Sequence, residues 1–299
     1  MIEIYSPLVH KGKVRKIKDI EVATLVKKYQ DRFGISTERF FRDLDRISIY
    51  QCTETGYSFY YPFNLDGDSF FYEELQRWKH YYEPWKWEHQ VALDRLKGDE
   101  KILEIGSGTG GFLGTLSERK FDITGLELNE KAVKESRANG WKVSNQTVQN
   151  HALEYPEKYD VVCSFQVVEH IATVKSFIQA SLDCLKPGGK MIISVPNNDS
   201  FMKLELNFLN CPPHHMGLWN QNSLEKLETI FDVTTSEVLL SPVGKHREYF
   251  KGVMLRYWKS KYRFISYRLL GLYFNWKEHS FCDVLKGLTI QVHFLKNEV

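Results

Sequence analysis

The chain has 299 residues, of which 42% are hydrophobic and 26% charged, so it suits one large domain, or a domain with a sizeable appendage, around a hydrophobic core. Its formal net charge of +2 at pH 7 neither indicates nor excludes a nucleic-acid partner. No apolar run approaches the roughly 18 residues that span a bilayer, and the N-terminus lacks the apolar stretch of a signal peptide. The five cysteines are scattered along the sequence, which argues against a disulfide framework. We therefore expect a cytoplasmic protein without a transmembrane segment.

The first part of the chain is crowded with aromatic side chains. Residues 57–87 contain thirteen of them. We predict that residues 1–90 form a helical, aromatic-rich cap, which packs on a second domain over residues 91–299. Each aromatic side chain can either line a ligand pocket or pack between the cap and that domain.

From residue 101 onward, strand-like and helix-like segments alternate. Between short apolar runs, apolar residues recur at helical spacing, as Val174, Phe177 and Ile178 do. This alternation indicates an α/β fold, a doubly wound sheet with helices on both faces, which binds ligands at the carboxyl ends of its strands. The predicted strands cover 101–106, 121–128, 141–148, 159–168, 190–196, 231–242 and 287–296, with a helical insertion over 243–286 before the last one.

The turn after the first of these strands reads LEIGSGTGGF (103–112) and has the G-x-G-x-x-G spacing of nucleotide-binding turns. A strand–turn–helix unit of this kind brings backbone N–H groups and a helix N-terminus up to a ligand. In a dinucleotide site that ligand is a pyrophosphate, which the carboxylate of Glu104 at the strand end would repel. Glu104 suits instead a ligand with an ammonium and a sulfonium group, such as S-adenosylmethionine. NAD is therefore rejected as the cofactor.

With these residues the sequence resembles a known family, the class I S-adenosylmethionine-dependent methyltransferases. The first motif of that family is an acid, any residue and then G-x-G-x-G, which corresponds here to Glu104, Ile105 and residues 106–110. The resemblance continues, in order and at consistent spacing, through GLELNEKAV, YDVVCSFQVVEHI and LKPGGKMIISVPN. It implies a Rossmann-like seven-stranded sheet whose seventh strand, 287–296, is antiparallel, and S-adenosyl-L-methionine as the cofactor.

The resemblance also implies which residues hold the cofactor. Glu127, at the end of the second strand, would bind both ribose hydroxyls, and the alternative is that it only caps the helix that starts at Asn129. Many members place an acid after the third strand for the adenine amino group, but this chain has TVQNHALEY, so we expect adenine near Asn150, His151 and Ala152. The remaining expected contacts, at the glycine turn, the strand ends, the methionine moiety and the sulfonium, are Glu104, Gly106, Ser107, Gly108, Gly110, Leu128, Gln166 and Tyr82.

Candidates for a catalytic base lie at the same edge of the predicted sheet. A hydroxyl acceptor benefits from a general base that removes its proton. VVEHI supplies Glu169 and His170 after the fourth strand, and CPPHHMGLWN supplies His214 and His215 after the fifth. The Pro-Pro-His-His loop is the favoured base or substrate contact, because in many relatives the residue at His170 belongs to a helix-entry turn. No spaced carboxylate set surrounds the adjacent histidines, so we predict no metal site.

The acceptor is less constrained than the cofactor. We expect O-methylation of a small molecule or of a sugar of a glycan or glycolipid, because no nucleic-acid-binding module accompanies the domain and small-molecule relatives share its pattern. The alternatives are an RNA or protein methyltransferase, and a subunit that binds the cofactor without turning it over. Residues 245–268 carry eight Lys or Arg and one acid among aromatic and apolar residues, which fits a solvated basic face, a site for a phosphate-bearing substrate, or RNA binding.

Overall fold

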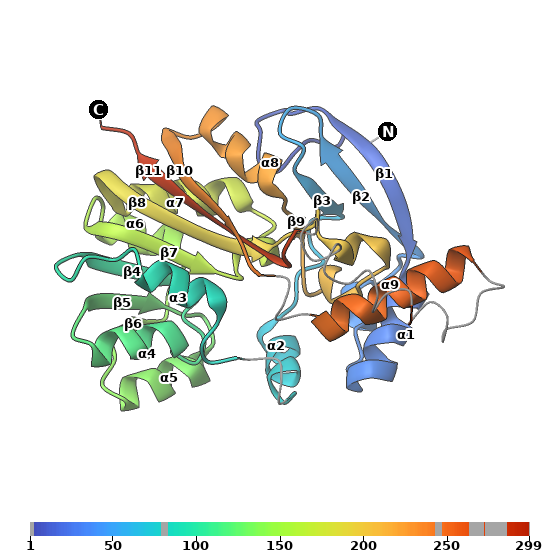
Figure 1. Cartoon of the computed structure of the whole chain (residues 1–299), viewed down its shortest axis with the longest axis horizontal. Coiled ribbons are helices and arrows are strands. Elements are labelled where there is room, and N and C mark those ends of the chain that lie inside the picture. The colour runs from blue at the N-terminus through green and yellow to red at the C-terminus, as the bar shows by residue number, and fades with distance from the viewer. Residues whose placement is uncertain (1–2, 79–82, 243–246, 263–271, 273–285, 299) are drawn as a thin grey trace.

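The structure is a computed structural model that describes residues 3–78, 83–242, 247–262, 272 and 286–298. Its main element is a seven-stranded sheet with the strand order β10-β11-β8-β7-β4-β5-β6 (Figure 1). All neighbours from β8 to β6 pair in parallel, whereas β11 is antiparallel to both β8 and β10. This confirms the predicted Rossmann-like sheet with an antiparallel seventh strand. The strands are β4 (Lys101–Ile105), β5 (Asp122–Leu126), β6 (Val143–Ser144), β7 (Tyr159–Phe165), β8 (Leu185–Pro196), β10 (Val233–Leu240) and β11 (Thr289–Lys296).

Helices cover both faces of this sheet because successive strand residues point to opposite sides. Ile102 packs in one core with Phe112 and Leu116, and Leu103 packs in another with Phe177. Burial of each such side chain stabilises the fold by roughly 1.5–3 kcal/mol. The helices on the first face are α3 (Trp87–Leu93), α4 (Gly111–Glu118) and α5 (Glu130–Ala138), and those on the second are α6 (Val148–Glu154), α7 (Val174–Asp183) and α8 (Gln221–Glu225).

The cap differs from the helical unit predicted for residues 1–90. It is built on an antiparallel sheet in the order β1-β2-β3-β9, in which β9 (Gly217–Leu218) comes from the second predicted domain. Ile47 and Ile49 are buried and alternate with more exposed residues, so they form the inner face of β2. The cap elements are β1 (Val14–Glu21), α1 (Val22–Phe33), β2 (Arg46–Cys52), β3 (Ser58–Tyr61) and α2 (Ser69–Gln76).

The cap and the large sheet share one hydrophobic core. Tyr57 and Phe59 of the cap are buried in the same cluster as Trp219 and as Ile193 of β8. The Tyr57 and Trp219 rings lie 4.2 Å apart between centroids. Residue 90 falls inside α3, so the boundary between the two predicted domains does not coincide with a linker.

The remaining elements are short, apart from α9 (Arg247–Lys261). This helix lies in the predicted insertion 243–286 and buries Phe250 and Val253 against Phe201; most of the rest of the insertion lies outside the described residues. None of the helices that the structure describes has the length and apolar character needed to cross a bilayer. Within the described ranges there are also five short 3-10 helices: η1 (Glu38–Phe40), η2 (Val168–His170), η3 (Phe201–Leu204), η4 (Phe208–Asn210) and η5 (Lys226–Thr229).

Candidate active site

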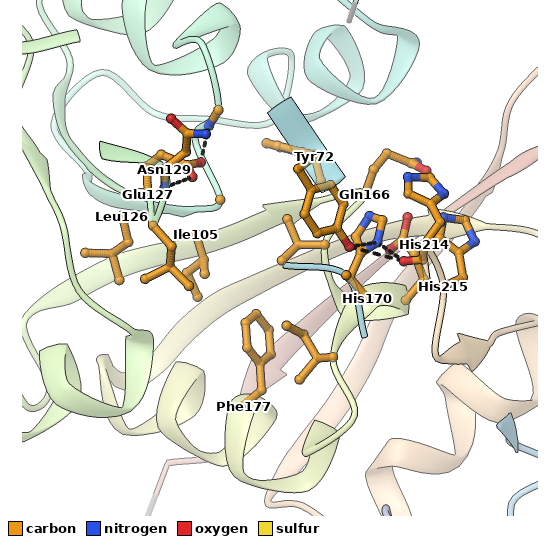
Figure 2. A pocket seen from close by; sticks show the side chains of 18 of the residues that line it. Tyr72, Ile105, Leu126, Glu127, Asn129, Gln166, His170, Phe177, His214 and His215 are labelled. Carbon is orange, nitrogen blue, oxygen red and sulfur yellow. Dashed lines mark hydrogen bonds between the residues drawn. The ribbon is translucent and has the colours of Figure 1, made fainter. Parts of the chain in front are cut away.

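A cavity of about 690 Å³ opens at the carboxyl ends of the parallel strands, between the large sheet and α2 of the cap. Glu127 lies at one end, and Tyr72 and the histidines described below lie at the other (Figure 2); Gly106 also lines the cavity. The volume is in the range of small-molecule sites. The cavity therefore lies where the fold class predicts a ligand.

The glycine turn after β4 has a backbone that other residues would strain. Gly106 and Gly110 have φ angles of 75° and 82°. A Cβ on Gly106 would collide with Val167, and one on Gly110 would collide with the Trp141 ring. Glycine is required at both positions by the left-handed backbone and by the close packing. Gly110 is the N-cap of α4, so the strand–turn–helix unit forms as predicted.

Glu127 stands at the edge of the cavity with its carboxylate already oriented. Its two oxygens accept the N–H groups of Gly108 at 2.8 Å and of Asn129 at 2.7 Å. The helix cap is supplied by Asn129, whose side chain accepts from Lys131 and Ala132, so capping does not explain Glu127. Each carboxylate oxygen keeps further acceptor capacity toward the cavity. Binding of a ribose by Glu127, beside the cavity-lining Leu128, stays a prediction.

Glu104 and Ser107 lie beneath the glycine turn. Both are buried, and neither Glu104 Oε2 nor Ser107 Oγ has a hydrogen-bond partner within the described residues. Burial raises the pKa of Glu104 well above its usual range, and the nearby Glu127 charge adds to this. A buried carboxyl with an unsatisfied oxygen is costly without a donor. An ammonium group is such a donor, so Glu104 fits that part of S-adenosylmethionine. Neither Glu104 nor Ser107 is among the residues that line the cavity, so their contact with the cofactor stays a prediction.

Next to the predicted adenine contacts, the residues that line the cavity come slightly earlier in the chain. Gln146, Thr147, Val148 and Gln149 line the cavity, as a cluster at the start of α6. Asn150, His151 and Ala152 are not among the lining residues: the first is exposed and the other two are buried. Thr147 is the N-cap of α6, so residues 150–152 lie in the first turns of the helix.

His151 lies behind these residues rather than among them. Its Nε2 is 2.8 Å from the Tyr159 hydroxyl, and its Nδ1 is 2.5 Å from the Gln146 amide nitrogen. Burial lowers the pKa of His151 to about 4, so the ring is neutral at pH 7. His151 therefore orients Gln146, and Gln146 faces the cavity.

Gln166 and Lys86 also line the cavity. Gln166 has a φ of 57° and donates its amide N–H to Glu88 at 3.2 Å. Burial raises the pKa of Glu88, and the charge of Lys86 acts in the opposite direction. Lys86 stands just before α3 and belongs to no motif of the sequence, so only the fold reveals it as a cavity residue. Tyr82 lies outside the described residues.

At the far end, folding brings together the three predicted histidines. His170, at the end of η2, has its Nδ1 2.5 Å from the carbonyl oxygen of His214 and 3.1 Å from the Tyr72 hydroxyl. The rings of His214 and His215 are stacked with centroids 4.4 Å apart. Burial lowers the pKa of His170 to about 4 and that of His214 to about 3, and holds the pKa of His215 well below its usual value. All three rings line the cavity and are neutral at pH 7.

Glu169 also lines the cavity, although it is buried. Its Oε2 has no hydrogen-bond partner in the described part of the chain. Burial raises the pKa of Glu169 to about 8, so the carboxyl holds its proton near neutral pH. Its backbone carbonyl accepts the N–H of Met216 at 2.8 Å, which ties η2 to the histidine loop.

The parallel sheet, the glycine turn and the Glu127 carboxylate define a class of protein, an α/β enzyme that binds a nucleoside-containing cofactor. Residues 77–235, more than half of the chain, match the model of a family described as methyltransferase domain, and the chain belongs to that family. It is a class I S-adenosylmethionine-dependent methyltransferase, as the motifs predicted.

Curated relatives match the chain in part. It is 29% identical over 116 residues to a ubiquinone biosynthesis O-methyltransferase of Proteus mirabilis (strain HI4320), a match that covers 37% of this chain and 47% of the relative. It is 27% identical over 106 residues to the protein of the same name from Photorhabdus laumondii subsp. laumondii, with 33% and 44% covered. The chain thus spans less than half the length of these relatives.

A solved structure has a similar fold. This S-adenosylmethionine-dependent methyltransferase from Thermotoga maritima is 18% identical and matches with a TM-score of 0.50, covering 77% of this chain and 98% of its own. At this identity the match supports the fold, which agrees with the strand order described above.

Proposed function

We propose that the protein transfers a methyl group from S-adenosylmethionine to a hydroxyl oxygen of a small molecule or a sugar. The observation that carries the proposal is one cavity with two chemically distinct ends. Glu127 and the glycine turn form the first end, and the buried histidines with Tyr72 form the second. Similarity to proteins named O-methyltransferases, at 27–29% identity, supports oxygen as the acceptor atom.

In this proposal the chain holds the cofactor through prepositioned groups. The two carboxylate oxygens of Glu127 accept hydrogen bonds from both ribose hydroxyls. The backbone N–H groups of Gly108 and Asn129 already orient these oxygens. The adenine lies against Gln146 and its neighbours rather than against residues 150–152. Lys86 pairs with the carboxylate of the cofactor, and Glu104 with its ammonium group. When bound, the cofactor supplies an electrophilic methyl group, and its sulfur leaves with the electron pair of the broken bond.

The acceptor occupies the second end. Met202 and Leu209 offer apolar surface there, and Tyr72 and the three histidines offer polar groups. An attacking hydroxyl must lose its proton, so the histidine cluster is the place where the acceptor oxygen is activated. Much of the remaining rate enhancement comes from alignment of the two ends.

Two other interpretations receive less support. The residues of α9 do not line the cavity, so the basic face of this helix is not part of the described site. A cofactor-binding subunit without turnover would not need a second, histidine-lined end. The cytoplasmic location stays a prediction.

An acceptor screen tests the proposal. The full chain is incubated with S-adenosylmethionine and panels of phenols, catechols, nucleotide sugars, amines, RNA and proteins, and mass spectrometry identifies the methylated atom. We expect an O-methyl product that is lost in His215→Ala while S-adenosylhomocysteine still binds. His10→Ala, a change at an exposed histidine, is the matched control and keeps the activity. A product methylated only on nitrogen, on RNA or on protein would refute the proposal.

A further inference from the structure

The loop before β9 contains a line of side-chain amides that ends on His215. His215 Nδ1 lies 2.8 Å from Asn210 Oδ1, and Asn210 Nδ2 donates to Asn198 Oδ1 at 2.5 Å. Asn198 Nδ2 donates in turn to two backbone carbonyl oxygens, to that of Pro196 at 3.3 Å and to that of Trp219 at 3.0 Å. No motif of the sequence singles out either asparagine, and only the fold brings them into one line with the ring.

The backbone end of this line fixes the direction of each hydrogen bond in it. A carbonyl oxygen only accepts, so the Asn198 amide directs its NH₂ group to the two carbonyls and its oxygen to Asn210. Asn210 then directs its NH₂ group to Asn198 and its oxygen to His215. An amide oxygen also only accepts, so His215 Nδ1 carries the proton. The pair Asn198 and Asn210 is called the amide relay below.

The backbone of each relay residue is tied to another part of the chain. Asn198 follows β8 closely, and its backbone N–H donates to the Trp219 carbonyl oxygen at 2.9 Å. The carbonyl oxygen of Asn210 accepts the hydroxyl of Tyr60, on β3 of the cap, at 2.7 Å. These bonds hold the two amides in place beside His215, as the supporting groups of a preorganised site must be held.

The relay decides which nitrogen of His215 is available to a ligand. The ring lines the cavity (Figure 2), and with the proton on Nδ1 its lone pair is on Nε2. Nδ1 is occupied by Asn210, whereas Nε2 makes no hydrogen bond within the described residues. Burial and the neighbouring His214 and His170 rings, the titratable groups that act on His215, hold its pKa well below its usual value. The lone pair on Nε2 is therefore not protonated at pH 7.

We propose that Asn210 and Asn198 are positioning residues for His215, and that His215 Nε2 takes the proton of the acceptor hydroxyl. The proton transfer rests on the proposed function. The acceptor oxygen forms a bond to the methyl carbon, the carbon–sulfur bond breaks with its electron pair staying on sulfur, and the hydroxyl proton moves to Nε2. A positive charge is lost at the sulfonium and another forms on the imidazole, so the net charge of the buried cavity does not change. The Asn210 oxygen, which accepts the Nδ1–H group, stabilises the imidazolium.

Nuclear magnetic resonance tests the tautomer without any acceptor. In the full chain with isotope-labelled histidine, the ring-nitrogen shifts distinguish Nδ1–H from Nε2–H, and the signals that disappear in His215→Gln are those of His215. We expect His215 in the Nδ1–H form. Asn210→Leu removes the orienting oxygen and Asn198→Leu lets the Asn210 amide turn, so both variants shift the ring toward the Nε2–H form. An Nε2–H form in the wild type, or an unchanged tautomer in Asn210→Leu, would overturn the relay.

Kinetics test the part of the relay in methyl transfer. Asn210→Leu should lower kcat about tenfold and leave the Kd of S-adenosylhomocysteine unchanged. Asn210→Asp keeps an oxygen at Nδ1 and adds a negative charge, which raises the pKa of His215; it should therefore retain more of kcat and move the acidic limb of the kcat–pH profile to higher pH. Asn64→Asp, at an exposed asparagine, is the matched control and changes neither quantity.

The two measurements separate the relay from folding and from the proposed function. S-adenosylhomocysteine binding shows that each variant is folded. A wild-type kcat in Asn210→Leu, or an acidic limb that does not move in Asn210→Asp, would overturn proton transfer to His215, although the proposed function stands. A protein that methylates no hydroxyl refutes the proposed function and the proton transfer together, and the tautomer of His215 then still decides whether the relay positions this ring.

Discussion

Glu127→Gln provides the most direct test of the cofactor end of the cavity. Both carboxylate oxygens accept backbone N–H groups, from Gly108 at 2.8 Å and Asn129 at 2.7 Å. An amide has only one oxygen, so its NH₂ group must face one of these N–H donors or a ribose hydroxyl that needs an acceptor. The variant loses the negative charge and leaves one donor unsatisfied. Charged hydrogen bonds contribute about 1.5–3 kcal/mol each, so a total loss of about 3 kcal/mol is expected, which is about a 150-fold increase in Kd.

Calorimetric titration with S-adenosylhomocysteine measures this increase, with NADH as the ligand that should not bind. Glu130→Gln is the matched control: this residue is three positions later, and its side chain is exposed and pairs with Lys134 at 3.8 Å. We expect the control to bind as the wild type does. If Glu127→Gln binds within about threefold of the wild type, with an unchanged melting temperature, then the ribose is not held by this carboxylate.

Three further predictions concern stability and binding. Gly110→Ala should lower the free energy of unfolding, measured by urea titration, by about 3 kcal/mol, because the new Cβ collides with Trp141. Gly140 has a similar φ of 79° but no atom within 4 Å of such a Cβ, so Gly140→Ala should cost only about 1 kcal/mol. Equal losses in the two variants would contradict the packing argument. Burial lowers the pKa of His89 from 6.5 to about 3, so only the unfolded chain binds this proton as the pH falls, and stability decreases. Between about pH 7.5 and about pH 5.5, His89 should reduce the free energy of unfolding by about 1.4 kcal/mol. His89→Gln should remove this contribution from the pH dependence measured by urea titration. Lys86→Met should weaken S-adenosylhomocysteine about tenfold, and an unchanged Kd would remove Lys86 from the carboxylate site.

The large sheet could be predicted from the sequence because its signals are local. Apart from the two-residue β6, each parallel strand is a short, largely apolar run. The glycines that the turn needs at Gly106 and Gly110 can be read directly from the sequence. The cap was expected to be helical and its sheet was not anticipated, because β1, β2 and β3 are short strands without a motif and the fourth strand joins them from a distance. β9 pairs with β3 across more than 150 residues, and two residues of strand have no periodicity to detect.

The sequence indicates which residues belong to the candidate site, but not how they are arranged in space. His170, His214 and His215 were each identified as candidates, but their convergence depends on how η2 and the loop after η4 pack. The cavity is lined by residues 146–149 rather than by 150–152, because α6 begins after its N-cap Thr147 and His151 faces Tyr159. The sequence carries no signal for this placement. Lys86 carries no motif at all, and only its location in the cavity makes it a candidate.

The architecture makes the cap a structural part of the acceptor end. The histidine loop continues directly into β9, which pairs with β3 of the cap, and Tyr60 of β3 donates its N–H to the Met216 carbonyl at 3.0 Å. Met216 in turn donates its N–H to the carbonyl of Glu169, beside His170. Backbone bonds on both sides therefore fix the loop, and the cap sheet cannot swing away without moving His214 and His215. The positions of the three imidazoles are consequently set by the joined cores of the cap and the large sheet, which is the rigidity that a preorganised site for an acceptor oxygen requires.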